Sequence, residues 1–381
     1  MKTSRTASST LLIGTAKGGF ALEGIGRAAK LRGPFLFGAK THDLRADPRS
    51  GRTWLMSSTG GHLGPTIYRS IDRGRTWSEA PHPPRFAPAR RKTAAPSVKI
   101  NFWLEPGHAD EPDVWYCGTS PQGLFRSEDG GQTWRGVDGW NRNPAWESWT
   151  SFGRDGTPDG PVLHSIQIDP RDARHMTVSC SSGGTFESLD QGGSWRPLNR
   201  GVAADFLPNP DAEYGHDPHC MRMHPADPDR WYQQNHCGIY RLDRAARAKT
   251  PSWTRIGTRM PKAVGDIGFP LVPHPTDADT VWVIPMDGRT IWPRTAVDGR
   301  PAVYMTRDGG RSWRRQDRGL PRSHAYWTVL RQAFTSDAGE PLGLYFGTTS
   351  GELWGSRDAG GSWRRLLAHL PRIYSVRWSG R

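Results

Sequence analysis

The chain has no long apolar stretch and few cysteines. In 381 residues no run approaches the roughly 18 apolar residues that a membrane-spanning helix needs. The apolar run near the N-terminus covers only Leu11 to Ile13, which is too short for the core of a secretory signal. The four cysteines contain no Cys-x-x-Cys pair, which favours free thiols over a disulfide framework. We therefore expect a soluble, cytoplasmic protein without a membrane segment.

Apolar residues are also scarce, at 35% of the chain, whereas 45 glycines, 32 prolines and 18 tryptophans are present. Glycine and proline favour tight turns, and indole rings supply the bulk that aliphatic side chains provide in other cores. The composition therefore predicts many short strands joined by turns.

The charge balance is strongly basic, with 51 Lys and Arg against 37 Asp and Glu, a net charge of +14. The basic residues are scattered, however, and the densest run is only Arg90-Arg91-Lys92. No motif of a nucleic-acid-binding module occurs. The sequence thus argues against a nucleic-acid partner and is compatible with a small anionic substrate.

An eight-residue pattern, S/T-x-D-x-G-x-S/T-W, recurs along the whole chain. Its copies are SIDRGRTW at 70–77, SEDGGQTW at 127–134, SLDQGGSW at 188–195, TRDGGRSW at 306–313 and SRDAGGSW at 356–363. A degenerate sixth copy contains Asp243, with its tryptophan delayed to Trp253. The pattern is typical of a β-hairpin turn in which the carboxylate accepts backbone hydrogen bonds, glycine takes a positive φ and tryptophan packs on the sheet. The turn carboxylates, to which we assign a structural role, are Asp72, Asp129, Asp190, Asp308 and Asp358.

With this repeat the chain resembles the Asp-box, or BNR, propellers, a group that includes sialidases, sortilin-like receptors and many uncharacterised bacterial proteins. The resemblance covers nearly the whole chain and implies a β-propeller of four-stranded blades. It says little about activity, because one fold hosts many functions.

Six copies of the pattern mark six blades, and the chain ends supply a seventh. Residues 11–22 resemble the second and third strands of a blade, and residues 372–378 resemble a first strand without a continuation. Pairing the two would close the ring and remove unpaired sheet edges. We expect an all-β, seven-bladed propeller over residues 1–381, six or eight blades being the alternatives. Long inter-blade links are expected at about 137–163 and 199–218, with a loop insertion at about 286–301.

Three histidines share one position of the repeat. His42, His164 and His219 each precede by five residues the Asp or His of an Asp-Pro or His-Pro turn, at the start of an innermost strand. His62 and His236 fall in loops between second and third strands. The resemblance implies that both places lie on the ligand-binding face, around the axis. Each single histidine could be a packing residue between blades, but the group predicts a metal site.

Converging neutral imidazoles suit zinc, iron, copper, nickel or manganese, with Asp or Cys completing the ligand set. The expected ligands, in order of preference, are His164, His219, His236, His62, His42 and Asp266. Without a metal, the same histidines could act as general acid and base.

The two long links are expected to bring aromatic and acidic side chains to the same face. The candidate catalytic residues are Glu147, Tyr214, Asp217 and Asp266, with Trp146 and Trp149 beside the first. Aromatics next to carboxylates suit a sugar or another polar ring substrate, and the anchoring of surface loops explains them about as well. Strand geometry, however, leaves His219 and His236 as the candidates for the centre. It favours a turn-shaping role for Asp217 and His216, and predicts that Cys220 points away from the centre.

A sialidase-type glycoside hydrolase would need three arginines around a carboxylate, a Tyr and Glu nucleophile pair and an Asp acid. The early Arg-Ile-Pro signature of sialidases is absent, and only Arg331 and Arg372 lie near starts of inner strands. The sequence predicts instead an enzyme with a histidine-lined, metal-binding funnel that acts on a small polar or anionic substrate, carbohydrates included. Metal-assisted hydrolysis, elimination and oxidation all remain open. The alternative is a non-catalytic propeller that binds proteins or ligands.

Overall fold

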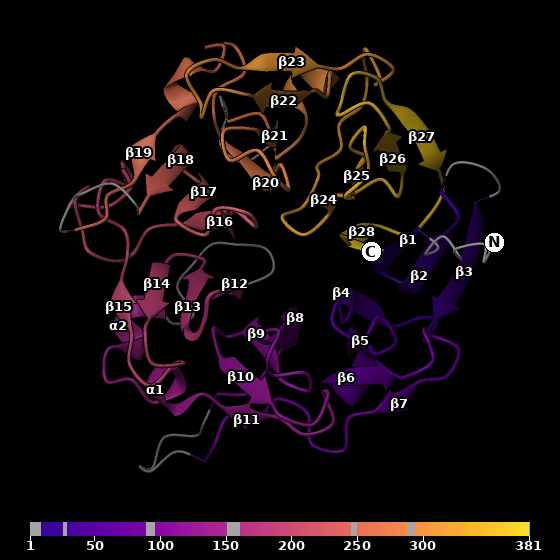
Figure 1. Ribbon diagram of the computed structural model, residues 1–381, viewed down its shortest axis with the longest axis vertical. Coiled ribbons are helices and arrows are strands. Elements are labelled where there is room, and N and C mark those ends of the chain that lie inside the picture. Colours follow the sequence, from indigo (N-terminus) through magenta and orange to yellow (C-terminus); the bar gives the residue numbers. More distant parts are fainter. Residues whose placement is uncertain are drawn as a thin grey trace, which may run out of the picture.

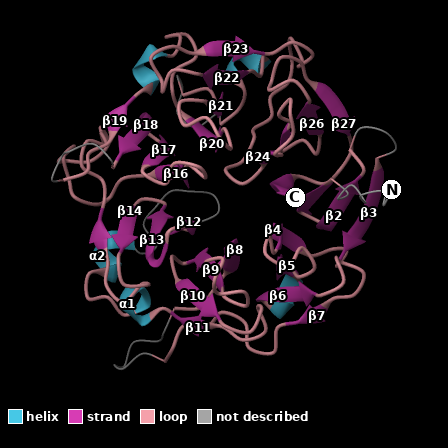
Figure 2. Cartoon of the chain, viewed as in Figure 1, coloured by secondary structure: helices cyan, strands magenta, loops and turns pink. Residues whose placement is uncertain are grey.

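The computed structural model describes residues 9–25, 29–88, 96–150, 161–244, 250–288 and 294–380. Its strands form seven four-stranded antiparallel sheets, which stand around a common axis like the blades of a propeller (Figure 1). Figure 2 shows how little helix accompanies them. The predicted all-β, seven-bladed propeller is therefore confirmed. None of the helices in these ranges is long and apolar enough to cross a membrane.

We number the blades 1 to 7 in the order in which their innermost strands follow along the chain. Blades 1 to 3 are β4 (Lys40–Ala46), β5 (Trp54–Thr59), β6 (Pro65–Ser70) and β7 (Ser78–Glu79); β8 (Ile100–Pro106), β9 (Trp115–Ser120), β10 (Leu124–Ser127) and β11 (Arg135–Gly136); and β12 (Leu163–Asp169), β13 (Asp172–Cys180), β14 (Gly184–Ser188) and β15 (Arg196–Pro197).

Blades 4 to 6 are β16 (Pro218–Met223), β17 (Arg230–Asn235), β18 (Gly238–Asp243) and β19 (Thr254–Arg255); β20 (Gly268–Pro273), β21 (Val281–Pro285), β22 (Val303–Thr306) and β23 (Arg314–Gln316); and β24 (Phe334–Ser336), β25 (Leu344–Gly347), β26 (Leu353–Ser356) and β27 (Arg364–Leu367). The first strand of each blade lies nearest the axis (Figure 1).

Blade 7 combines both ends of the chain, as predicted. It consists of β28 (Ile373–Ser379), β1 (Thr10–Thr15), β2 (Gly18–Glu23) and β3 (Lys30–Phe35), in that order from the axis outward. The two end strands pair antiparallel, with Thr10 opposite Ser379 and Leu12 opposite Arg377. This pairing closes the ring, because each end strand covers the sheet edge that the other would otherwise leave unpaired.

The expected tryptophan-rich core lies within and between the blades. The largest fully buried side chains include Trp103, Trp115, Trp140, Trp231 and Trp282. All four cysteines, Cys117, Cys180, Cys220 and Cys237, are buried and unpaired, as the sequence predicts.

The repeated turns use their carboxylates as caps. Asp129 Oδ1 accepts hydrogen bonds from the backbone N–H groups of Gln132 and Thr133, both at 2.9 Å, and Oδ2 accepts the Thr133 hydroxyl at 2.6 Å. Equivalent bonds are made by the other four carboxylates, Asp72, Asp190, Asp308 and Asp358. Such bonds, led by the one from the Ser312 hydroxyl, lower the pKa of Asp308 to about 2. The carboxylate oxygens of these aspartates thus accept hydrogen bonds from their own turns. In the degenerate sixth copy, Asp243 instead pairs with Arg230 and Arg241.

In several of the turns the glycine has a second role, which the sequence pattern does not show. Gly310 has φ +95°, and a Cβ added to it would lie 2.4 Å from Cβ of Ile256, in the preceding blade. Gly131 faces Leu55 and Gly360 faces Gln316 in the same way. The turn therefore packs against its neighbour through a position where only glycine has room.

Part of the predicted link at 137–163 is helical. It contains α1 (Asp138–Asn141) and α2 (Trp146–Thr150), and residues 151–160 lie outside the described ranges. The indole N–H groups of Trp140 and Trp146 both donate to the carbonyl of Gln122, at 2.9 and 3.0 Å. Trp146 and Trp149 are buried core residues and not exposed at a binding surface.

Short 3₁₀ turns complete the secondary structure. They are η1 (Gly61–Leu63), η2 (Gly257–Arg259) and η3 (Val297–Gly299), the last of which lies in the expected insertion at 286–301. Residues 289–293 of that insertion lie outside the described ranges. The link at 199–218 contains no helix, and β16 begins at its last residue.

A buried ion-pair network joins strands of blade 3. His175 Nδ1 lies 2.9 Å from Asp169 Oδ2, and its Nε2 lies 2.9 Å from Glu187 Oε1. Arg196 also pairs with Glu187, at 2.6 Å. Burial raises the pKa of Glu187, but the hydrogen bond with His175 and the charges of nearby arginines outweigh it and lower the pKa to about 2.

This depressed pKa predicts a loss of stability in acid. Because the unfolded carboxyl titrates near 4.5, the unfolded state binds more protons than the folded state between pH 4.5 and about 2. The free energy of unfolding should thus fall across this window, by an amount of the order of 3 kcal/mol from Glu187. Urea unfolding from pH 6 to pH 2 measures it. Glu187→Gln should flatten the slope, exposed Glu79→Gln should not, and equal slopes in both variants would contradict the assignment.

Replacing Gly310 with alanine should destabilise the fold for two reasons, backbone strain and a clash with Ile256. Gly38 has a similar φ, +97°, but a Cβ there would meet nothing within 4 Å, so Gly38→Ala isolates the backbone strain. We expect a loss of about 1–2 kcal/mol for Gly38→Ala. Gly310→Ala should lose clearly more, about 3 kcal/mol or more, because it adds the clash with Ile256. Chemical denaturation measures both, and equal losses would argue against the packing role.

Candidate functional site

The innermost strands share a local irregularity that determines where their side chains point. The register with the second strand shifts in β4 between Thr41 and Leu44, in β12 between His164 and Gln167, and in β16 between Pro218 and Cys220. Strands β8 and β20 shift at the corresponding place. Bulges of this kind break the alternation of a strand and re-aim side chains. The three histidines that share one repeat position lie at or beside these shifts.

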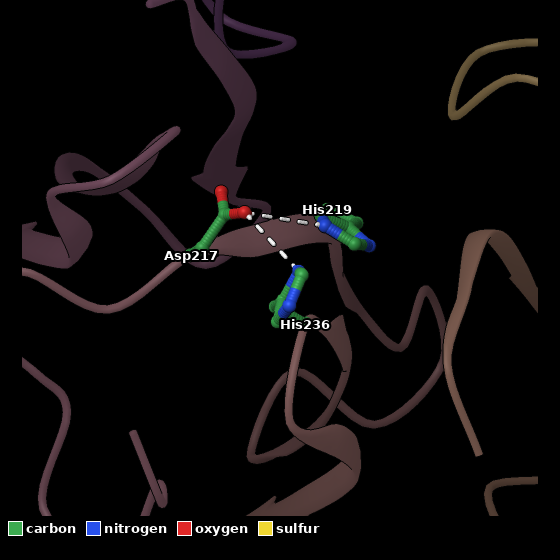
Figure 3. Close-up of side chains that lie close together, drawn as sticks. All are labelled: Asp217, His219 and His236. Atoms are coloured by element: carbon green, nitrogen blue, oxygen red, sulfur yellow. Dashed lines mark ion pairs between the residues drawn. The ribbon is translucent and has the colours of Figure 1, made fainter. Parts of the chain in front are cut away.

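Asp217, His219 and His236 converge at the axial end of blade 4 (Figure 3). Asp217 Oδ2 lies 3.4 Å from His219 Nε2 and 3.7 Å from His236 Nδ1. The backbone N–H of His236 donates to the Asp217 carbonyl at 2.9 Å, which fixes the β17–β18 turn beside the start of β16. In the described ranges, this is the one group of three or more potential metal ligands within 4.8 Å of one another.

The orientation of His219 is fixed by a backbone carbonyl. Its Nδ1 lies 2.6 Å from the carbonyl oxygen of Gly268 and donates to it. The ring is 4% exposed and packs against Phe269, with 4.8 Å between ring centroids. The Nε2 atom of the same ring faces Asp217 Oδ2. Histidines that bind metals are commonly held in this way.

The protonation states of the group suit a cation. Burial raises the pKa of the Asp217 carboxyl, but His219 and the charge of Arg331 hold it well below its usual range. Burial and the neighbouring His219 lower the pKa of His236, which is 32% exposed. Near pH 7 an ionised carboxylate therefore lies beside a neutral imidazole, the forms in which both groups coordinate metals.

His164, the first expected ligand, lies outside this group. It is fully buried, and its Nδ1 lies 2.8 Å from the hydroxyl of Ser165. Burial, together with the charge of Arg331, lowers the pKa of His164 well below the usual value. Asp217 and His219 lie near enough to influence the pKa of His164. His164 is therefore a neighbour of the group but not a member of it.

His42 also does not join the group. Its ring is 5% exposed and packs between Tyr374 and Phe102, at centroid distances of 4.8 and 6.0 Å. His42 is therefore placed as a packing residue between blades. The backbone of His62 lies in η1, and its side chain lies outside the described residues.

Of the candidate catalytic residues, Asp217 is the one that lies in the group. Asp266 is held by Arg255 through two contacts of 3.0 Å. It lines an open cavity of about 500 Å³ together with His236, Phe206 and Cys237. Glu147 is exposed on α2 and Tyr214 is 39% exposed in the link at 199–218; neither is part of the group.

Strand geometry favoured a turn-shaping role for both Asp217 and His216, and the structure gives this role to His216 alone. The Nε2 of His216 donates to the carbonyl of Ala212, at 2.6 Å. The carboxylate of Asp217 points to the histidines instead (Figure 3). Its spacing of two residues from His219 was the available signal, because residues i and i+2 of an extended chain share a face.

Two arginines border the group, Arg331, which the sequence places near the start of an inner strand, and Arg294, in the insertion at 286–301. The guanidinium carbon of Arg331, from blade 6, lies 5.5 Å from the ring centre of Phe102 and 5.6 Å from that of Phe269. Its Nη1 donates to the Ser181 hydroxyl of blade 3 at 3.3 Å. One side chain that contacts blades 2, 3 and 5 must lie on the axis. Arg294 lies 6.0 Å from the ring centre of Phe269.

No family model matches the chain. A probable oligoxyloglucan-reducing end-specific xyloglucanase from Neosartorya fischeri is 25% identical over 241 residues, which are 57% of this chain and 27% of that protein. The chain thus spans about a quarter of the length of this curated relative.

Solved structures show the same fold. The crystal structure of a GH74 xyloglucanase from Xanthomonas campestris superposes with a TM-score of 0.62 at 17% identity, over 97% of this chain and 52% of that one. A putative 6-phosphogluconolactonase from Bacteroides fragilis superposes with a TM-score of 0.56 at 11% identity, over 99% of both chains. At these identities the similarity establishes a shared propeller fold and no more.

Proposed function

We propose that the chain is a metal-dependent enzyme whose active centre is formed by Asp217, His219 and His236, and whose substrate is a small polar or anionic compound. The observation that carries the proposal is the arrangement of the three side chains around one point. Tetrahedral ligands at zinc bond lengths lie about 3.3–3.4 Å apart. The separations of 3.4 and 3.7 Å from Asp217 Oδ2 need little adjustment to reach this geometry.

The donor set limits the choice of metal. Two imidazoles and one carboxylate are the ligands of many zinc sites and of non-haem iron sites with open positions. Copper, nickel and manganese remain compatible. The metal would act as a Lewis acid on a substrate oxygen or on water. The protein would contribute the rigid hydrogen bond from His219 to Gly268 and the ionised form of Asp217.

The surrounding charges favour an anionic substrate group. Arg331 lies on the axis and influences Asp217, and Arg294 influences His236. Guanidinium groups bind carboxylate and phosphate through paired N–H donors. The open cavity beside His236 provides room for the remainder of a small substrate.

A second candidate, glycoside hydrolysis, is favoured by the names of the xyloglucanase relatives. It would need two carboxyl groups, one of which keeps its proton through a raised pKa. Asp205 and Asp266 line the cavity, and Asp217 contacts His236 in its wall. The lowered pKa of Asp217 argues against its acting as the acid. Release of sugar from xyloglucan oligosaccharides that persists after chelation, and is lost in Asp266→Asn, would favour this candidate over the metal enzyme.

Elemental analysis tests the metal directly. We expect about one transition-metal ion per chain in protein purified without a His tag, and at least a tenfold loss of affinity in His236→Gln and Asp217→Asn, because each removes one of three ligands. Exposed His82→Gln is the matched control and should retain the metal. Circular dichroism confirms folding of each variant. Metal-free wild-type protein, or full occupancy in both ligand variants, would disprove the site.

Titration calorimetry tests the role of Arg331. Inorganic phosphate and glycolate, as probes for phosphate and carboxylate groups, should bind with dissociation constants at least tenfold larger in Arg331→Gln than in the wild type, because the charged pair of donors is lost. Arg372→Gln is the control, since Arg372 is exposed and packs against Tyr374. Titrations with and without a chelator separate this role from metal binding. Unchanged affinities in Arg331→Gln would contradict it.

A further inference from the structure

A second group of charges lies on the propeller axis, formed by the innermost strands. The guanidinium carbons of Arg222 on β16 and Arg377 on β28 lie 4.8 and 4.7 Å from the ring centre of Trp103 on β8. These strands belong to blades 4, 7 and 2, none of which are neighbours in the ring. Contacts between such blades have to cross the axis. The three side chains therefore meet on the propeller axis, around which β8, β16 and β28 lie in Figure 1.

Two arginines of this axial group have carboxylate partners. Arg377 makes two hydrogen bonds to Asp43, of 3.0 and 2.9 Å, and a third to Gln332, of 2.8 Å. Arg45 makes a bidentate pair with Glu105, at 2.5 and 2.6 Å. Both carboxylates are thus occupied by other cations.

Each carboxylate also accepts a further hydrogen bond. The backbone N–H of Leu104 donates to Asp43, and the indole N–H of Trp103 donates to Glu105, both at 3.1 Å. Neither carboxylate is left as a counter-ion for another arginine. The axial group therefore holds three arginines and two committed carboxylates.

Arg222 is the arginine without a counter-ion. Across the ranges that the structure describes, its side chain makes neither a hydrogen bond nor an ion pair, and the residue is partly buried on β16. The cation–π contact with Trp103 stabilises this charge in part. Burial, and the charges of Arg377 and Arg45, lower its pKa, against the opposite influence of Cys220 and Glu105.

We propose that Arg222 binds a small monovalent anion, a halide or an oxyanion of similar size, in the central channel. The three arginines carry one more positive charge than the two carboxylates balance. A monovalent anion would neutralise this excess. The ion would serve as counter-ion to three guanidinium groups from blades 4, 7 and 1, and would thereby stabilise contacts across the axis. This site is independent of the proposed metal centre, because it uses none of its residues.

Bromide is a suitable probe, because it is monovalent and visible by anomalous diffraction. In crystals grown with sodium bromide, we expect an anomalous peak within about 3.5 Å of the Arg222 guanidinium. In solution, the thermal unfolding midpoint of the wild type should rise as bromide replaces fluoride at constant ionic strength, by mass action on the folded state.

Arg222→Met keeps an unbranched side chain over Trp103 and removes the charge. It should abolish the bromide-dependent rise, and without bromide its midpoint should equal or exceed that of the wild type, because the repulsion of Arg222 by Arg377 and Arg45 is lost. Arg135→Met, on the exposed strand β11, is the control for general salt effects and should respond as the wild type does. The absence of a bromide peak at Arg222, or an equal bromide response in Arg222→Met, would overturn the proposal.

Discussion

The antiparallel pairing of β28 with β1 is the contact on which the axial chemistry depends. Six residue pairs join the two ends of the chain and make one blade from segments that are more than 350 positions apart. The closed ring holds β28 beside β4 and β24. It also places Arg377 against Asp43 and Tyr374 against His42. An open arc of six blades would have no axis on which such side chains could meet.

The blade count and the turn chemistry could be predicted because both depend on short segments. The pattern around Asp129 contains its own donors, acceptor and glycine within eight residues, so its hydrogen bonds are encoded locally. The packing of Gly310 against Ile256 is not encoded in that way. It requires the neighbouring blade, which the pattern does not include.

The candidate site could be predicted only in part, because the register shifts in the inner strands are not visible in the sequence. His42, His164 and His219 share one repeat position, and simple alternation would give them one orientation. The bulges give them three environments: an aromatic contact, a buried hydrogen bond to Ser165, and a place beside Asp217. Contacts across the axis, such as those of Arg331, could not be predicted either, since periodicity carries no information on distances between non-neighbouring blades.

Arginines and potential metal ligands lie close together on the axis, so the charges of the arginines act on the ligands and on any metal that binds there. Arg331 and Arg294 help keep Asp217 ionised and His236 neutral, which prepares the ligands for a metal. The same positive charges oppose the arrival of a metal cation. An anionic substrate group between the metal and Arg331 would neutralise both. Under the proposed function, metal and substrate would therefore strengthen each other's binding by the same factor, as linkage requires. The arginines would then make the centre selective for the complex of metal with anion over either ligand alone.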